Sequence, residues 1–208
     1  MENDIIEIKY AMDTFYFLIS GVLVMWMAAG FTMLEAGLVR SKNTTEILAK
    51  NVALYSIACV MYLIMGYTVM YGGISNLYVP DGFFGISAAN STAEEVLASG
   101  GDTYYSGASD FFFQVVFVAT AMSIVSGAVA ERMKLWAFLA FAVVMTGFIY
   151  PMQGSWSWGG GFLGENIGYS DYAGSGIVHL CGAAAALAGV LILGPRIGKY
   201  SASGESNA

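Results

Sequence analysis

The span DYAGSGIVHLCGAAAALAGVLILG (Asp171–Gly194) decides how the chain is organised. It is apolar over a length that can cross the hydrocarbon core of a bilayer, and it carries His179, the only histidine of the chain. On a helix, the residues that share a face with His179 are all small, which lets a neighbouring backbone come close to this face. These residues are Ser175, Gly176, Gly182, Ala183 and Ala186.

The imidazole of His179 has two interpretations from the sequence. An ionisable side chain inside a membrane is costly, so a histidine that lines a pathway is the working hypothesis. The alternative is a histidine that is hydrogen-bonded to a polar group of a neighbouring helix, because buried polar groups usually have partners.

The composition is that of a membrane protein. The chain has 208 residues, of which 57% are hydrophobic and 11% are charged, whereas soluble domains carry about 25% charged residues. The net charge is −7 and the few basic residues flank apolar spans, so we expect no nucleic-acid partner.

The two cysteines and the N-terminus exclude other classes. Cys59 and Cys181 both fall in apolar spans and give neither a disulfide framework nor a metal-binding spacing, so we expect no cofactor and no metal. The first residues, MENDIIEIKY, are acidic and lack the basic region of a signal peptide. We therefore expect the first apolar span to stay in the mature protein.

Near-continuous apolar runs of about 20 residues predict five transmembrane helices. Their ranges are 14–38, 52–73, 110–131, 135–152 and 173–194. The connection 74–109 is long, rich in Gly, Ser, Asn and acidic residues, and predicted to lie outside the bilayer; a second connection spans 153–172. The polar tail 200–208, YSASGESNA, predicts no sixth span.

The basic residues predict the orientation. Lys9 alone precedes the first span, and the other seven Lys and Arg all fall on the opposite side of the predicted membrane. The positive-inside rule then places the N-terminus outside and the C-terminus in the cytoplasm, in a multi-pass protein of the cell (inner) membrane. The seven residues are Arg40, Lys42, Lys50, Arg132, Lys134, Arg196 and Lys199.

One carboxylate, Glu35 in MLEAGLVRSKN, lies near the cytoplasmic end of the first span, about one turn before Arg40. A charge that snorkels or pairs at the interface is the favoured interpretation, ahead of a catalytic role.

Three consecutive phenylalanines, Phe111, Phe112 and Phe113, follow Asp110 at the outer mouth of the third span. Consecutive residues point in different directions around a helix, so at most one or two of these rings can line a pore.

A second aromatic group lies in the connection before the fifth span. Trp156 and Trp158 precede a run of three glycines, which lets the backbone fold back over a pore mouth and makes the indoles a candidate lid or cation platform. Asp171 stands where the fifth span starts. There it can cap free N–H groups of the helix, and it can also add negative charge at the outer entrance.

With these residues in view, the chain resembles the ammonium transporter family (Amt/Mep/Rh). The resemblance runs from Asp13 to about Lys199 and is carried by five segments in order: LEAGLVRSKN (34–43), FFQ (112–114), SGAVAERMK (126–134), WGGGFL (158–163) and DYAGSGIVH (171–179). The family fold has eleven transmembrane helices, in which the first five and the next five form an inverted repeat around a pore. The resemblance therefore implies an all-α membrane protein whose five transmembrane helices form the first inverted repeat of that fold, a partial ammonium transporter domain over residues 1–208.

The resemblance also implies roles for four residues, each matched by its motif. Phe113, before Gln114, matches the outer-gate aromatic, with Phe112 as the alternative. Trp158 matches the aromatic of the external recruitment site, and Asp171 matches the acidic residue that supports it. His179 matches the first of the twin histidines of the pore. The implied substrate is ammonium or ammonia, with selectivity against methylammonium left open; the implied partners are two further copies in a homotrimer and a PII-type regulator on the cytoplasmic face.

The mechanism that suits these residues is cation recruitment at the aromatic site, deprotonation, and passage of ammonia past His179. Two alternatives remain: an ammonium sensor module of a signalling protein, and an inactive half-transporter. An intramembrane enzyme is disfavoured, because one histidine without a second buried carboxylate forms no hydrolytic or metal constellation.

Overall fold

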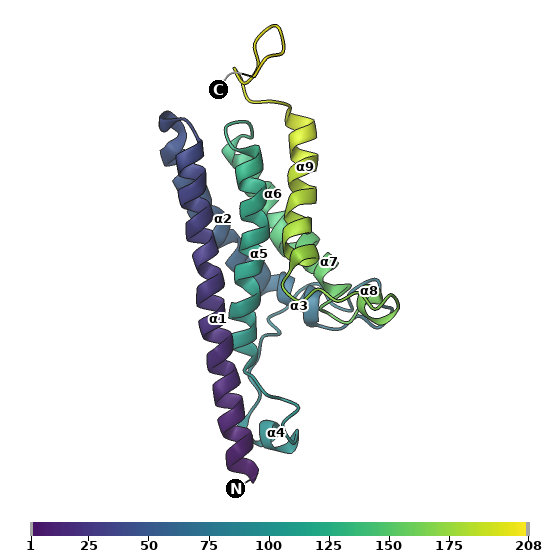
Figure 1. Cartoon of the computed structure of the whole chain (residues 1–208). Helices are drawn as coiled ribbons and strands as arrows, with labels where there is room; N and C mark the ends of the chain where they lie inside the picture. Colours follow the sequence, from purple (N-terminus) through teal and green to yellow (C-terminus); the bar gives the residue numbers. More distant parts are fainter. Residues whose placement is uncertain (1, 207–208) are drawn as a thin grey trace.

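The computed structural model describes residues 2–206, in which the chain is a bundle of long helices (Figure 1). The described residues contain no strand beyond an isolated β-bridge between Tyr200 and Ser206, which confirms the all-α fold. The elements are α1 (Glu2–Leu38), η1 (Ser41–Asn43), α2 (Thr44–Met61), η2 (Tyr62–Gly66), α3 (Tyr67–Tyr71), α4 (Ala93–Ala98), α5 (Gly107–Val129), α6 (Leu135–Val144), η3 (Met145–Ile149), α7 (Tyr150–Ser155), α8 (Phe162–Glu165), η4 (Ser175–Leu180) and α9 (Cys181–Leu193). The last two residues of the predicted polar tail 200–208 lie outside the described residues.

Five helical segments are long and apolar enough to cross a membrane, which confirms the predicted number. They are Asn3–Leu38, Ser41–Tyr71, Gly107–Val129, Leu135–Ser155 and Ser175–Leu193. The first two begin well before the predicted positions 14 and 52. At 37 residues, α1 is about 55 Å long, against a hydrocarbon core of about 30 Å. The helix therefore continues past the apolar stretch into the acidic N-terminal segment, which an apolar run alone cannot reveal.

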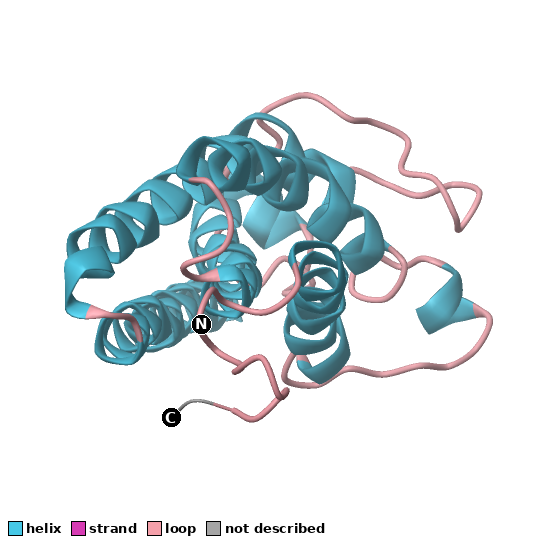
Figure 2. Cartoon of the chain, turned by 90° about the horizontal axis from the view of Figure 1, so that it is seen from above, coloured by secondary structure: helices cyan, strands magenta, loops and turns pink. Residues whose placement is uncertain are grey.

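The third span, α5, is the centre of the bundle. It packs against α1, α2 and the fifth span, while α6 covers α2 and α7 covers α3. Viewed from above, the helices are grouped together, and two long connections extend outward from the bundle (Figure 2). Three residues in the middle of α5, Val118, Ala121 and Met122, are fully buried. This helix therefore fixes the positions of the other spans.

The small residues of the fifth span bring its backbone close to α5, as the sequence predicted. A Cβ on Gly182 would lie 2.7 Å from the carbonyl oxygen of Ala121, and Ala186 is also buried. Ala183 and His179 instead lie on the exposed side of the same helix. Only part of the small-residue face is therefore used for packing inside this chain.

Three of the five spans contain a π-helical segment: η2, η3 and η4. Such segments insert extra backbone into a helix and often occur at functional sites, because they change the direction of the side chains that follow. The segment η4 contains His179, whose backbone N–H donates to the carbonyl of Gly174 at 2.9 Å.

The basic residues gather at the end of the bundle where α1, α5 and α9 end. Glu131 joins this end together: it pairs with Arg40 at 3.1 Å and with Arg196 at 3.5 Å. Burial alone raises the pKa of the Glu131 carboxyl, but hydrogen bonds from the Arg40 backbone, from Asn43 and from the Arg40 guanidinium outweigh burial and lower the pKa to about 2. An ionised Glu131 thus fastens the first span and the C-terminal segment to the end of α5.

Candidate functional site

An open cavity of about 720 Å³, which we call the aromatic vestibule, lies at the other end of α5. Residues of α1, α3, α5 and the two long connections line it, and most of them are aromatic. The lining consists of Phe17, Tyr67, Tyr71, Tyr104, Tyr105, Asp110, Phe113, Gln114, Phe117, Trp158, Tyr172 and Ala173. A cavity walled by aromatic faces and one carboxylate suits a small cation.

The phenylalanine triplet diverges around α5, as predicted. Phe111 turns into the core and stacks on Tyr62. Phe112 packs on α1, where its ring lies within 3 Å of the position that a Cβ on Gly21 would take. Phe113 lines the vestibule. Of the two candidates from the sequence, only Phe113 faces the cavity.

The ring that contacts Trp158 is Phe117, a residue that the sequence analysis did not single out. Its centroid lies 6.2 Å from that of Trp158 and 5.0 Å from that of Phe113, in edge-to-face geometry in both cases. Phe117 stands four residues after Phe113 and therefore on the same helix face, a spacing that would have marked it. The vestibule thus contains a continuous series of rings, from Phe113 through Phe117 to Trp158.

Asp171 holds Trp158 in place through the backbone. The indole Nε1 donates to the carbonyl oxygen of Asp171 at 2.7 Å. The Asp171 carboxylate, 8% exposed, accepts four backbone N–H groups at the start of the fifth span, at 2.7 to 2.9 Å. They belong to Gly174, Ser175, Gly176 and Ile177. The predicted cap is therefore present.

This capping determines the charge of Asp171. Burial alone raises the pKa of its carboxyl, but the four backbone N–H groups outweigh burial and lower the pKa below its usual range. Both carboxylate oxygens accept backbone N–H groups at the start of the fifth span. The Asp171 carboxylate is therefore not part of the lining of the vestibule. Asp171 consequently contacts Trp158 through its backbone carbonyl and not through its charged side chain.

The carboxylate that does line the vestibule is Asp110, in the first turn of α5. It is 5% exposed and accepts the phenolic hydroxyl of Tyr67 at 2.6 Å and, more weakly, the amide of Gln114 at 3.4 Å. Its place in the first turn of an apolar span could have marked Asp110 as a candidate site residue. Its burial could not be predicted, because it depends on Tyr67 from a distant span.

His179 lies apart from the vestibule, farther along the fifth span. It is exposed, and within residues 2–206 no hydrogen bond to its ring is present. The packed alternative, a histidine bonded to a neighbouring helix of this chain, is therefore not what the structure shows. The structure brings Phe113, Trp158 and Asp171 together and leaves His179 on an open face of the bundle.

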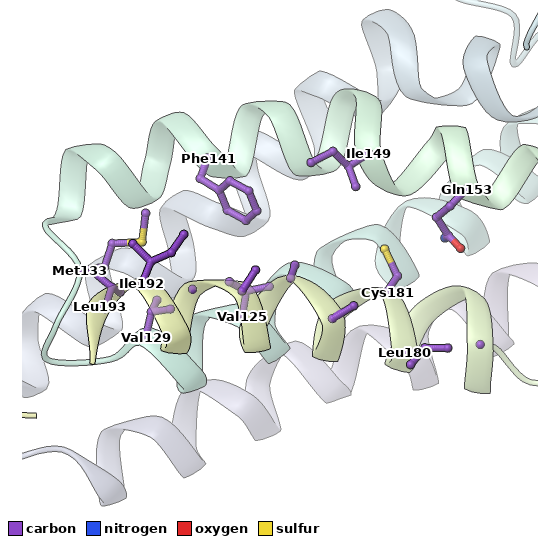
Figure 3. Close-up of a pocket in the computed structure, with 15 residues that line it drawn as sticks. Val125, Val129, Met133, Phe141, Ile149, Gln153, Leu180, Cys181, Ile192 and Leu193 are labelled. Atoms are coloured by element: carbon purple, nitrogen blue, oxygen red, sulfur yellow. The ribbon is translucent and has the colours of Figure 1, made fainter. Parts of the chain in front are cut away.

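A separate apolar groove of about 600 Å³ runs between the fifth span, the fourth span and the end of α5 (Figure 3). Figure 3 shows mainly aliphatic side chains along it, with Gln153 and Cys181 at one end. Gln153 is already bonded to the carbonyl of Ile177 at 2.8 Å. None of the lining residues is charged, and most of them are aliphatic.

Comparison with known proteins identifies relatives of this chain. The model of the Ammonium Transporter Family matches residues 15–208. Ammonium transporter Amt2 of Archaeoglobus fulgidus is 40% identical over 206 residues, covering 94% of this chain and 41% of the relative. Ammonium transporter Amt1 of Haloferax mediterranei is 40% identical over 202 residues, covering 92% of this chain and 36% of the relative.

A solved structure titled "Sensor Amt Protein" superposes with a TM-score of 0.84 at 31% identity, covering 97% of this chain and 49% of that one. The chain thus spans less than half the length of the curated relatives that it matches.

Proposed function

Because the chain belongs to the ammonium transporter family, we propose that it forms part of a pathway that carries ammonium or ammonia across a membrane. One observation carries the proposal: the aromatic vestibule opens beside the start of the span that bears His179. The family match, the five membrane-spanning helices and the position of the vestibule before His179 along the fifth span all support this proposal.

The energetics favour passage of the neutral form. Removing an ion from water into an apolar pore costs tens of kcal/mol in the idealised limit, and each aromatic face returns only about 0.5 to 2 kcal/mol. The rings can therefore collect an ammonium ion at the mouth but cannot carry it through. Ammonia loses far less on leaving water, so the ion has to give up a proton before it crosses.

We assign roles on this basis. Trp158 and Phe113, with Phe117 between them, hold the cation; Asp171 fixes the indole. His179 accepts or orients the deprotonated substrate, since an imidazole can both donate and accept a hydrogen bond. The exposed position of His179 fits a pathway that further protein closes from the other side.

The orientation and the partners belong to the same proposal. Seven basic residues at one end support a cytoplasmic C-terminus and an N-terminus outside the cell (inner) membrane. We further propose that the protein assembles as a homotrimer and that a PII-type regulator docks on the basic end.

A second candidate is a sensor module. The likeness to the structure titled "Sensor Amt Protein" favours it. In that case ammonium binding at the vestibule would be read out by a signalling domain, and binding without sustained uptake is the expected behaviour.

Uptake into proteoliposomes tests the proposal. The 208-residue chain and the product of the whole reading frame that encodes it are each reconstituted, and ammonium uptake is followed by internal pH and by ¹⁵N content. Substituting Trp158 or His179 by Ala should reduce uptake at least tenfold, whereas Trp136→Ala, which removes an indole that is 81% exposed, should leave it unchanged. Equal uptake by the Trp158, His179 and Trp136 variants would overturn the proposal.

A further inference from the structure

One buried carboxylate of the aromatic vestibule has no cation beside it. Asp110 is 5% exposed, and none of the ion pairs among residues 2–206 includes it. Lys9, the single basic residue before the first span, is exposed on α1. Buried charges in proteins are normally paired, because removing an isolated ion from water is costly. Asp110 therefore lacks the opposite charge that a buried carboxylate needs.

Three other carboxylates with buried side chains are compensated within the chain. Glu35 lies 3.6 Å from the ammonium group of Lys50. Asp171 accepts four backbone N–H groups, and Glu131 pairs with two arginines. The partners of Asp110 are two neutral side chains, so its charge is the one that the described protein does not balance.

The carboxylate of Asp110 belongs to the wall of the vestibule. Asp110, Phe113, Gln114 and Phe117 follow the spacing i, i+3, i+4 and i+7, which is one face of α5, and all four line this cavity. The Tyr67 hydroxyl, which donates to Oδ2 at 2.6 Å, comes from a further lining residue. An ion held by the two phenylalanine rings is therefore on the same face of α5 as the carboxylate.

The acceptor capacity of this carboxylate is only partly used. An ionised carboxylate has about four acceptor positions. The bond from Tyr67 fills one of them, and the amide of Gln114 approaches Oδ1 at 3.4 Å, near the upper limit for a hydrogen bond. The protein thus leaves room on Asp110 for a donor that comes from the vestibule.

The charge of Asp110 also acts on a residue outside its own helix. Tyr105, in the connection before α5, lines the same cavity and stacks on Phe17 of α1 with a centroid distance of 4.4 Å. Burial raises the pKa of the Tyr105 hydroxyl, and the negative charge of Asp110 raises this pKa further. The field of the carboxylate therefore extends across part of the vestibule.

We propose that Asp110 is the counter-ion of an ammonium ion bound in the aromatic vestibule. This inference rests on the transport function proposed above and adds a residue to its binding site. Ammonium supplies the positive charge that the buried carboxylate lacks, and its N–H groups can donate to the free acceptor positions. The aromatic rings attract any small cation through their faces, whereas a carboxylate adds a directed, charge-assisted hydrogen bond.

A purely structural role is the competing explanation. An acidic residue in the first turn of α5 stabilises the start of the helix, and its bond to Tyr67 holds α3 against α5. A protonated Asp110 with this bond would need no cation. The structural role depends on the hydrogen bond, and the counter-ion role depends on the charge.

Two substitutions separate the bond from the charge. Asp110→Asn removes the charge but keeps an oxygen that can accept the Tyr67 hydroxyl. Its NH₂ group can donate to Oε1 of Gln114, which is buried without a partner among the described residues. Tyr67→Phe does the opposite: it removes the bond, keeps the ring, and leaves the carboxylate with one more free acceptor position.

The experiment measures ammonium binding to the product of the whole reading frame in lipid nanodiscs. We titrate ¹⁵N-ammonium chloride at matched ionic strength and follow ¹⁵N line broadening; the binding that Trp158→Leu removes is assigned to the vestibule. Asp110→Asn should weaken this binding by about tenfold or more, whereas Tyr67→Phe should leave it unchanged or tighten it. Asp102→Asn, the same substitution at an exposed carboxylate of the preceding connection, should have no effect.

Unchanged ammonium binding in Asp110→Asn overturns the proposal. A loss in Tyr67→Phe as large as the loss in Asp110→Asn also overturns it, because equal losses mark a structural role of the hydrogen bond. If Asp110→Asn fails to fold, Asp110→Glu and Asp110→Gln are compared, since they differ in charge and not in length. Binding at least tenfold tighter in Asp110→Glu then supports the counter-ion, and equal binding overturns it.

The two proposals fail separately. Absence of uptake by the wild-type chain and by the product of the whole reading frame would remove the transport function. Uptake that depends on Trp158, combined with ammonium binding that does not depend on the charge of Asp110, would remove only the counter-ion role.

Discussion

Replacing Asp171 by Asn should destabilise the protein far more than a typical carboxylate substitution. The carboxylate accepts two N–H groups on Oδ1, from Gly174 and Ser175, and two on Oδ2, from Gly176 and Ile177. An asparagine has one acceptor oxygen and one NH₂ group. It can keep one pair of hydrogen bonds, but its NH₂ group then faces the other two N–H donors.

The magnitude follows from this count. Hydrogen bonds to a charged group contribute about 1.5–3 kcal/mol each, so losing two of them costs about 3–6 kcal/mol, before any repulsion between donors. Because the backbone of Asp171 also holds the Trp158 indole, the loss should reach the vestibule as well.

Thermal unfolding in lipid nanodiscs measures the stability, and near-ultraviolet circular dichroism reports the tryptophan environment. Asp102→Asn is the control, since this exposed carboxylate lies in a connection. Asp171→Asn should lower the melting temperature and alter the tryptophan signal, whereas Asp102→Asn should do neither. Equal melting temperatures for the two variants would refute the reasoning.

Three further predictions follow from the packing and the charges. Gly182→Ala should cost about 1–3 kcal/mol by overpacking the contact with α5, while Gly30→Ala, with nothing within 4 Å, should be tolerated; chemical denaturation compares them. Glu131 has a lowered pKa of about 2, so its contribution to stability should be complete above about pH 4.3, the usual value of an unfolded glutamate, and should fall as the pH drops towards 2; pH-dependent melting of Glu131→Gln should lack this fall. Phe117→Ala and Trp158→Ala should be coupled by about 0.5–1.5 kcal/mol in a double-mutant cycle of stability, because the rings meet edge to face.

The sequence predicted the five spans because the length of an apolar run is a local property. It could not predict where α1 and α2 begin, since both helices continue beyond their apolar runs and backbone hydrogen bonds sustain a helix there regardless of hydropathy. The divergence of Phe111, Phe112 and Phe113 was predictable from helix geometry alone. The cap by Asp171 was also predictable, because the N–H groups that it accepts are three to six residues away.

The features that could not be predicted from the sequence depend on contacts between segments that are distant in the chain. Glu35 appeared to belong with Arg40, which is near in the sequence, but Ser126 is 91 residues away and determines its orientation. Phe117 gains its importance only from the fold of the connection that brings Trp158 to it. Asp110 is buried because Tyr67 covers it from another span. Each of these pairs requires the packing of α5 against its neighbours to be known.

The polar side chains of α5 are concentrated towards its two ends. Asp110 and Gln114 lie at one end and Ser123 and Ser126 at the other. Between Gln114 and Ser123 the only polar side chain is Thr120, whose hydroxyl is bonded to the backbone of its own helix at 2.8 Å. At 1.5 Å per residue, this apolar stretch is about 13 Å long.

A cation beside that stretch would lose its water without gaining hydrogen bonds from α5, which supports the proposal that the neutral form crosses. His179 belongs to this middle: Gly182, three residues after it, packs at Ala121 and Ile124. Under the transport function proposed above, the substrate would therefore lose its proton before it reaches His179, on the side of α5 where Asp110 lines the vestibule.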